Sequence, residues 1–287
     1  MKRRSILPLL FVPIVAIMFG VFMLQSGRIT VKGSDTMVIL AQRWAEVYMS
    51  KHGGTAIQVT GGGSGTGISA LINGTTDIAN SSRPIKRSEV EKLKGRFATL
   101  GVEIPCAKDG LAVYLSDSNP VQELTLQQIK DIYTGKIQNW KEVGGKDAKI
   151  LLYSRENNSG TYVYFKDNVL KGEDFPSSAQ TMPGTAAVVN AVGKDVNGIG
   201  YGGAAYGKGI KFLKVKKDEK SSGYEPNAQT VASGEYPITR YLYMYTRSKP
   251  TGALKEYIDW ILSPEGQEIV TKVGYFPVKT FSSTGSK

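Results

Sequence analysis

The residues best suited to bind or transform a ligand lie in one short stretch, 154–161, with the sequence Ser-Arg-Glu-Asn-Asn-Ser-Gly-Thr. Arg155 carries a forked cation that matches the oxygens of an oxyanion. Ser159 and Thr161 add hydroxyl donors, and Gly160 lets a ligand approach the backbone closely. These residue types favour the binding of a small anion by neutral donors and one arginine.

The elements on either side place this stretch at the start of a helix. An apolar run at 150–153 predicts a strand, and the pattern at 162–170 predicts a helix. The first N–H groups of a helix have no internal partner, and the helix dipole adds about half a positive charge there, so an anion is stabilised. The structural alternative is a helix capped by Ser159, with Arg155 in solvent.

Similar residues recur in three other turns, which follow the predicted strands at 29–33, 56–60 and 77–80. Each turn combines small hydroxyl residues with glycine, aspartate or arginine. The candidate binding residues in these turns are Ser34, Asp35, Thr36, Ser64, Gly65, Ser82 and Arg83. Open α/β sheets bind ligands at the carboxyl ends of their strands, so four such turns in one chain predict a shared site.

The glycine-rich turn at 61–67 requires comparison with nucleotide-binding loops. No Lys-Ser or Lys-Thr pair follows it, and its glycines do not have the spacing of a dinucleotide-binding fingerprint. Backbone amides and hydroxyls without a lysine suit a small anion better than a nucleotide. A flexible turn that binds no ligand is the structural alternative.

Enzymatic alternatives require residues that the chain places unfavourably. A serine hydrolase needs a base, and the single histidine, His52, follows a predicted helix end beside two glycines, which is typical of a surface helix terminus. The single cysteine, Cys106, is interpreted as a packing residue. No His, Asp or Glu residues have the spacing of a metal site. We therefore expect a protein that is not an enzyme, without catalytic residues, metal or cofactor.

The first 28 residues differ from the rest of the chain. Lys2, Arg3 and Arg4 precede an uncharged apolar run from Ile6 to Leu24. This pattern predicts either a cleaved export signal or an N-terminal membrane anchor, and either one places the remainder outside the cytoplasm. With one cysteine in the chain, no intrachain disulfide is possible, and no lipid-attachment cysteine follows the leader.

The chain is basic, with a net charge of +11 over 287 residues. Removing residues 1–28 removes four basic side chains and no acidic one, which leaves 32 minus 25, or +7. A basic surface attracts anions in general. The basic residues are scattered, which does not favour nucleic-acid binding, and the densest group, Lys208 to Lys220, is predicted to be an exposed loop.

The remaining pattern predicts an α/β chain with two lobes. Two strongly strand-forming stretches, 102–115 and 236–245, are interpreted as the connections between the lobes. Capping boxes are expected at Thr125 with Gln128 and at Ser88 with Glu91. The other predicted elements are helices at about 34–51, 64–71, 88–96, 125–133, 185–194, 253–262 and 264–273 and a strand at 197–201.

The ordered motifs resemble those of the PstS family, the phosphate-binding proteins of the ABC phosphate uptake system. The matching segments are 33–37, 63–67, 81–84, 155–161 and 236–238. The likeness covers nearly everything after residue 28, and Arg-x-x-x-Ser-Gly-Thr is its most specific part. It implies an α/β two-lobed periplasmic-binding-protein fold of type II with a two-strand hinge, here preceded by an N-terminal apolar helix. Lobe 1 would comprise 29–105 with 241–287, and lobe 2 would comprise 106–240.

The resemblance also implies which residues hold the ligand. The family's arginine falls on Arg155 and its other contacts on Ser159, Gly160, Thr161, Ser64 and the turn of Ser34, Asp35 and Thr36. One departure concerns the fourth turn, where well-studied members hold an aspartate that accepts a proton from phosphate and rejects sulfate. That position is Ser82 here, followed by Arg83. Asp35 is the alternative acceptor, unless it caps its helix.

The resulting hypothesis is a monomeric, extracytoplasmic or periplasmic substrate-binding protein. It would capture inorganic phosphate in a cleft between the lobes and deliver it to the permease subunits of an ABC transporter in the membrane, without binding nucleic acid. The alternatives are a binding protein for another tetrahedral oxyanion, a membrane-anchored phosphate sensor, and a phosphatase or serine hydrolase.

Overall fold

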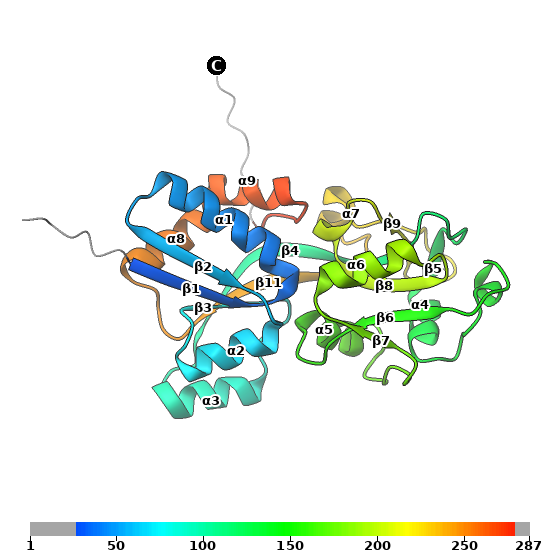
Figure 1. The fold of residues 1–287 in the computed structure, drawn as a ribbon, viewed down its shortest axis with the longest axis horizontal. Helices are drawn as coiled ribbons and strands as arrows, with labels where there is room; N and C mark the ends of the chain where they lie inside the picture. Colours follow the sequence, from blue (N-terminus) through cyan, green and yellow to red (C-terminus); the bar gives the residue numbers. More distant parts are fainter. Residues whose placement is uncertain (1–26, 279–287) are drawn as a thin grey trace, which may run out of the picture.

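The computed structural model describes residues 27–278, which form two lobes side by side (Figure 1). The strands are β1 Gly27–Gly33, β2 Thr55–Thr60, β3 Ile78–Ser81, β4 Val102–Leu115, β5 Glu123–Thr125, β6 Leu151–Arg155, β7 Gln180–Met182, β8 Gly198–Gly203, β9 Lys211–Phe212, β10 Lys214–Lys216 and β11 Thr239–Thr246. The helices are α1 Val38–Lys51, α2 Ser64–Asn73, α3 Arg87–Phe97, α4 Leu126–Tyr133, α5 Gly160–Asn168, α6 Thr185–Lys194, α7 Ala228–Ser233, α8 Gly252–Ile261 and α9 Pro264–Val273, with short 3-10 turns at η1 Asp35–Met37, η2 Trp140–Val143 and η3 Ala204–Tyr206.

Lobe 1 contains a sheet with the strand order β2-β1-β3-β11-β4. β1 pairs in parallel with β2 and β3, whereas β11 pairs antiparallel with β3 and β4. Helices α1, α8 and α9 cover one face of this sheet, and α2 and α3 cover the other (Figure 1). Trp44 of α1 is buried there, and its Nε1–H donates to Gly266 O at 2.8 Å, which ties α1 to α9.

Lobe 2 continues the sheet in the order β4-β8-β6-β7. β6 pairs in parallel with both β7 and β8, so the carboxyl ends of β6 and β7 lie at the same edge. Residues of α4 and α5 pack in one core cluster and residues of α6 pack in another. This arrangement places the turn after β6, which is the Arg155 turn, at the edge that faces lobe 1 (Figure 1).

The strand β4 belongs to both lobes. Its residues 102–110 pair with β11, and its residues 111–115 pair with β8. Accordingly, Ala107 packs in the core of lobe 1 and Leu111 packs in the core of lobe 2. The second connection leads into β11. Just before this strand begins, Ile238 O accepts the N–H of Leu111 at 2.8 Å. The lobe limits at 105/106 and 240/241 stay a prediction.

Most predicted helices and strands are confirmed. In these elements the hydrophobic periodicity and the residues typical of element ends indicate the same limits. The helices at 185–194 and 264–273 have the predicted limits. The capping box at the start of α4 is confirmed: Thr125 Oγ1 accepts the N–H of Gln128 at 3.1 Å, and Gln128 Oε1 accepts the N–H of Thr125 at 2.9 Å.

Two local predictions are wrong. The capping carboxylate of α3 is Glu89 rather than Glu91, since Glu89 Oε2 accepts the N–H of Lys86 at 2.8 Å. The segment 208–220 is not simply an exposed loop, because it contains β9 and β10 and buries Leu213 and Val215. In these strands every second side chain enters the core, but the lysines between Leu213 and Val215 and on either side of them make the segment look uniformly polar in the sequence.

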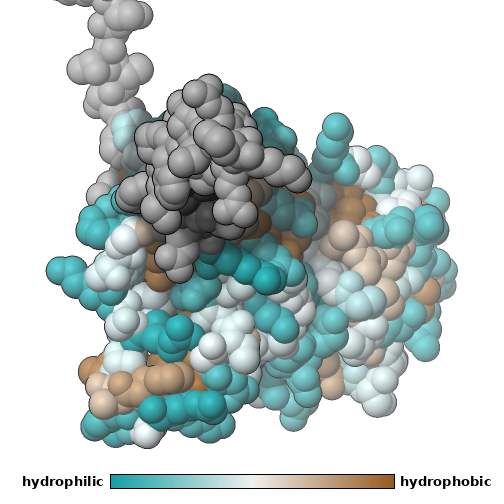
Figure 2. All heavy atoms as spheres, turned by 60° about the vertical axis from the view of Figure 1, so that its left-hand side comes forward, coloured by the Kyte–Doolittle hydropathy of each residue, from teal (hydrophilic) through white to brown (hydrophobic). Residues whose placement is uncertain are grey.

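The predicted leader, 1–28, lies outside the described residues except for Gly27 and Arg28, which belong to β1. Within 27–278, no helix combines the length and apolar character that a membrane crossing requires. On the face shown in Figure 2, hydrophilic residues dominate and hydrophobic residues form separate small patches.

The capping box of α4 gives a first prediction. Thr125→Ala removes the oxygen that accepts the Gln128 N–H, so the variant should lose about 1 kcal/mol of unfolding free energy. Urea denaturation followed by circular dichroism measures this loss. Thr251→Ala is the matched control, because Thr251 is an N-cap residue whose side chain makes no capping hydrogen bond. Equal losses in both variants would contradict the assigned cap.

Candidate anion-binding site

Five hydroxyl side chains from both lobes lie together. Ser34 Oγ donates to Ser82 Oγ at 3.0 Å, and Ser64 Oγ lies 3.4 Å from Ser82 Oγ. Thr161 Oγ1 of lobe 2 lies 2.8 Å from Thr36 Oγ1 and 3.4 Å from Ser82 Oγ. All five residues are at most 3% exposed. The structure therefore gathers four separate turns into one buried group, which we call the hydroxyl cluster.

Helix N-termini surround this cluster. Helix α2 begins at Ser64, helix α5 begins at Gly160, and α1 follows the short turn that starts at Asp35. Ser159 caps α5, because its Oγ accepts the N–H of Thr161 at 3.2 Å, which agrees with one half of the structural alternative; the other half, an Arg155 in solvent, is wrong, since Arg155 is 2% exposed. The positive ends of these helix dipoles favour negative charge at the cluster.

The two lobes touch at the start of α5, and glycine makes this approach possible. A Cβ atom built on Gly160 would overlap Ser64 Oγ and lie 2.7 Å from Ser82 Oγ. Beside it, the N–H of Gly65 donates to Asn158 O at 2.9 Å, and the Asn158 amide donates to the backbone of the same glycine-rich turn. The lobes are therefore in direct contact across the site.

Arg155 is almost fully buried and donates in three directions. Its Nη2 donates to Asp35 Oδ2 at 2.8 Å, its Nη1 to Thr185 Oγ1 at 2.9 Å and its Nε to Glu156 Oε2 at 3.2 Å. Only 2% of the residue is exposed. Asp35 belongs to lobe 1 and Arg155 to lobe 2, so this ion pair joins the lobes at the residue that lies between Ser34 and Thr36 of the hydroxyl cluster.

The contacts of Asp35 decide between its predicted roles. Its Oδ1 accepts the N–H of Gly62 at 2.7 Å and its Oδ2 accepts Arg155, so its carboxylate does not cap α1. Its backbone oxygen accepts the hydroxyl of Tyr206 at 2.6 Å. Burial, and secondarily the Asp35 carboxylate, raises the pKa of Tyr206 to about 12, so this hydroxyl stays protonated at neutral pH.

Sequence reasoning missed a second buried ion pair next to the cluster. Arg240 of β11 lies opposite Asp109 of β4, and its Nη2 donates to Asp109 Oδ2 at 2.8 Å and to Thr161 Oγ1 at 3.1 Å. The sequence pattern indicates both residues only as parts of the connecting strands. A charged residue within an otherwise apolar strand could have indicated the pair, because a buried charge requires a partner of opposite charge.

Arg83 differs from the other candidates. Its guanidinium donates to both carboxylate oxygens of Glu89, at 2.7 and 2.9 Å, and to Pro84 O at 2.9 Å. These hydrogen bonds fasten the fourth turn to α3 and direct the charge toward that helix. Among the described residues, none of its hydrogen bonds reaches the hydroxyl cluster.

His52 and Cys106 occupy the predicted structural positions. His52 follows the end of α1, where its ring stacks on Tyr48 at 4.1 Å and its Nδ1 lies 3.1 Å from Tyr48 O. Cys106 is fully buried in the core of lobe 1, and its Sγ donates to Leu242 O at 3.4 Å. Burial raises the pKa of this thiol well above its usual value, which keeps it un-ionised.

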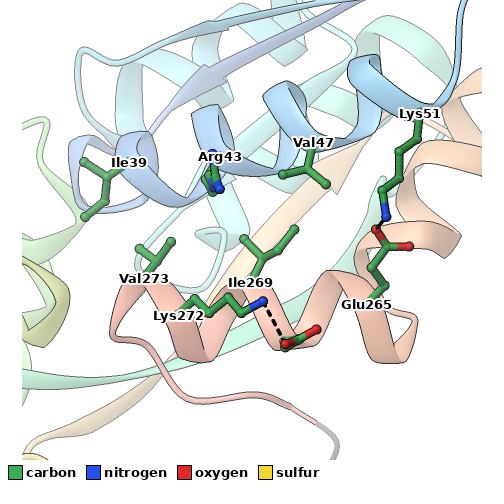
Figure 3. A pocket seen from close by; sticks show the side chains of 9 residues that line it. Ile39, Arg43, Val47, Lys51, Glu265, Ile269, Lys272 and Val273 are labelled. Carbon is green, nitrogen blue, oxygen red and sulfur yellow. Dashed lines mark hydrogen bonds and ion pairs between the residues drawn. The ribbon is translucent and has the colours of Figure 1, made fainter.

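A groove of about 590 Å³ lies between α1 and α9 (Figure 3). Aliphatic side chains form its walls, and ion pairs join Lys51 to Glu265 at 2.5 Å and Lys272 to Glu268 at 2.7 Å. No predicted site residue lines it. Residues 27–278 also contain no group of three or more His, Cys, Asp or Glu placed to hold a metal ion.

Comparisons with known proteins show which family the chain resembles. The family model of the PBP superfamily domain matches residues 24–265. The phosphate-binding protein PstS of Pseudomonas aeruginosa is 33% identical over 270 residues, which cover 88% of this chain and 84% of that protein. PstS of Bacillus subtilis is 36% identical over 260 residues, which cover 90% of this chain and 83% of that protein.

Solved structures are similar as well. One from Clostridium perfringens, described as a phosphate ABC transporter substrate-binding protein with bound phosphate, has a TM-score of 0.81 and 34% identity and covers 88% of this chain and 100% of that chain. An ABC-type phosphate transport receptor from Vibrio cholerae has a TM-score of 0.69 and 29% identity, with coverage of 86% and 99%.

The close approach at Gly160 gives a second prediction. Gly160→Ala should hold the lobes apart, because its Cβ would overlap Ser64 Oγ; overpacking of this kind costs about 1–3 kcal/mol. Small-angle X-ray scattering should show a larger radius of gyration, and thermal unfolding should begin earlier. Gly95→Ala in α3 is the control, since a Cβ there meets nothing within 4 Å. An unchanged radius would refute direct lobe contact.

The third prediction concerns Arg83 and pH. Burial alone would raise the pKa of Glu89, but the bonds from Arg83 and from the Lys86 N–H outweigh it and lower this pKa. A carboxyl with a lowered pKa contributes stability above its unfolded pKa and loses it as pH falls through the folded value. Arg83→Ala should therefore cost roughly 2 kcal/mol near neutral pH, and the difference from wild type should shrink below about pH 4.

Urea denaturation across this pH range measures the effect. Arg87→Ala is the control, because Arg87 is exposed on the first turn of the same helix. A pH-independent loss of stability would contradict the role of the Arg83 and Glu89 pair.

Proposed function

The chain belongs to the PstS family of phosphate-binding proteins within the PBP superfamily, and from this we propose that it captures inorganic phosphate between its lobes and delivers it to an ABC transporter. The observation that supports this most strongly is the hydroxyl cluster. Its donors come from both lobes, are buried, and lie beside an arginine at 2% exposure. Such a site suits a small oxyanion that is surrounded on all sides.

The physical basis is replacement of the ligand's hydration shell. A bound oxyanion would exchange its water for hydroxyl, amide and guanidinium donors, and charge-assisted hydrogen bonds offset the cost of its desolvation. In the present structure these hydroxyls hydrogen-bond one another, so ligand entry exchanges one set of hydrogen bonds for another. The hydroxyl donors therefore have hydrogen-bond partners both without and with the ligand, so neither state carries the energetic cost of unsatisfied buried donors.

The proposed contacts come from four turns. The residues are Ser34, Thr36, Ser64, Gly65, Ser82, Arg155, Ser159, Gly160 and Thr161. Asp35 acts on the ligand through Arg155, whose guanidinium it holds at 2.8 Å. Arg83 leaves the set, because its guanidinium bonds only to Pro84 and Glu89 of its own lobe, whereas Arg155 reaches across the lobes to Asp35.

Selectivity depends on Ser82. A hydroxyl group both donates and accepts, so it can accept a hydrogen bond from the P–OH group of hydrogen phosphate, but it does not repel an unprotonated oxygen as a carboxylate would. Asp35 already accepts from Arg155 and Gly62, which favours a positioning role over a discriminating one. We therefore expect phosphate to bind, with weaker exclusion of sulfate than a carboxylate acceptor would provide.

Transport requires more than binding. Opening of the lobes about β4 and the segment before β11, as a two-strand hinge of a type II fold, would admit phosphate. The closed form would be the one that a membrane permease recognises. We propose that the protein acts as a monomer outside the cytoplasm, with residues 1–28 as export signal or anchor, and that it turns over no substrate.

Arg155→Ala provides the fourth prediction. Removing a buried charge-assisted partner costs about 2–5 kcal/mol, so phosphate affinity should fall by roughly 30-fold or more. Isothermal titration calorimetry with phosphate and with sulfate, between about pH 5 and pH 9, measures this loss and the selectivity together. The reason is the three-way placement of this guanidinium beside the hydroxyl cluster.

His52→Ala is the control and should bind phosphate like the wild type, because His52 packs on Tyr48 at the far end of α1. Wild-type protein that shows no heat with phosphate would overturn the proposed function. Release of phosphate from a phosphate ester by pure protein would overturn the assignment as a binding protein.

A further inference from the structure

A buried arginine and aspartate, Arg240 and Asp109, lie where the chain passes between the lobes. They are directly opposite each other in the pairing of β11 with β4. Arg240 Nε and Nη2 donate to Asp109 Oδ2 at 3.0 and 2.8 Å, and Asp109 Oδ1 accepts the N–H of Ala204 in lobe 2 at 3.1 Å. Asp109 is fully buried and Arg240 is 5% exposed.

The remaining contacts of Arg240 go to the hydroxyl cluster. Its Nη2 donates to Thr161 Oγ1 at 3.1 Å, and its Nη1 donates to the backbone oxygen of Ser82 at 3.1 Å. One guanidinium therefore reaches the proposed site from both sides, through a residue of lobe 1 and a residue of lobe 2. A pair needed only to hold the two strands together would not require these contacts.

The hydrogen bond to Thr161 has a chemical consequence. A guanidinium can only donate, so Thr161 Oγ1 must accept from Arg240. The single hydroxyl hydrogen of Thr161 is then directed away from Arg240, toward Thr36 Oγ1 at 2.8 Å, Ser82 Oγ at 3.4 Å or a ligand oxygen. The arginine thus fixes this hydroxyl as a donor to the site.

The hydrogen bond to Ser82 acts in the same way on the backbone. The N–H of Ser82 donates to Ser64 Oγ at 3.1 Å, and its carbonyl accepts from Arg240. Both peptide groups of Ser82 are therefore held, which fixes the position of its hydroxyl in the cluster. The Tyr164 ring, 5.4 Å from the Arg240 guanidinium, holds the arginine in place from lobe 2.

We propose that Arg240 is a positioning residue for phosphate binding, held by Asp109, which acts by committing the Thr161 hydroxyl as a donor to the ligand. This inference rests on the proposed function. It assigns a second arginine to the site. This arginine orients the hydroxyl donor of Thr161 and does not itself contact the ligand. Because a donor hydroxyl suits any unprotonated oxygen, its loss should weaken phosphate and sulfate alike.

A double-mutant cycle tests the proposal. Arg240→Gln and Thr161→Val, singly and together, are titrated with inorganic phosphate and with sulfate by calorimetry. Each single change should weaken binding by about tenfold or more, the usual effect of a hydrogen bond that involves a charged group. If Arg240 acts through Thr161, the double variant should bind about as weakly as the weaker single variant.

Two other results would overturn the proposal. In one, the fold-loss of affinity in the double variant equals the product of the two single fold-losses. In the other, Arg240→Gln binds phosphate with unchanged affinity. Both presume that the wild type binds phosphate, so they are distinct from failure of the proposed function. Arg247→Gln is the matched control, since Arg247 follows β11 and donates to Thr76 O outside the cluster. Should Arg240→Gln fail to fold, Asp109→Asn with Arg240→Gln replaces it, because that pair leaves no buried charge.

Discussion

The buried hydroxyl cluster imposes the constraint on which the rest of the structure depends. Buried polar groups must find hydrogen-bond partners, and each hydroxyl of the cluster finds them in the turns of the opposite lobe or the neighbouring strand. At the hydroxyl cluster, the two lobes, each with its own hydrophobic core, therefore meet through polar contacts. Water or a ligand can satisfy the same polar groups, because water-mediated hydrogen bonds can replace direct ones.

Charge around the cluster is balanced by pairing. Arg155 is paired with Asp35 across the lobes and with Glu156 of its own lobe, and Arg240 is paired with Asp109 within the connecting strands. Burying an unpaired guanidinium would be costly, so each arginine needs its carboxylate in the absence of ligand. An anion consequently meets oriented dipoles and already-paired cations, and selectivity depends on which groups can donate and which can accept.

The connecting strands link folding to function. Because β4 pairs with β11 in one lobe and with β8 in the other, both cores depend on the same strand. The charged pair of Asp109 and Arg240 lies where this change of partner occurs. The position that joins the lobes is thus also the position that reaches Thr161 and Ser82.

The sequence by itself determined the local elements and the polar turns that hold the proposed site. Strand and helix periods and the four polar turns are local properties, and the motif from Arg155 to Thr161 is the most specific sequence indication of the family. Only the tertiary structure decided which charges meet. Arg83 pairs with Glu89, Asp35 pairs with Arg155, and Arg240 enters the site. The reason is that an ion pair depends on where the fold places two side chains, whether they are six residues apart, as Arg83 and Glu89 are, or lie in different lobes, as Asp35 and Arg155 do, and no local pattern encodes that placement.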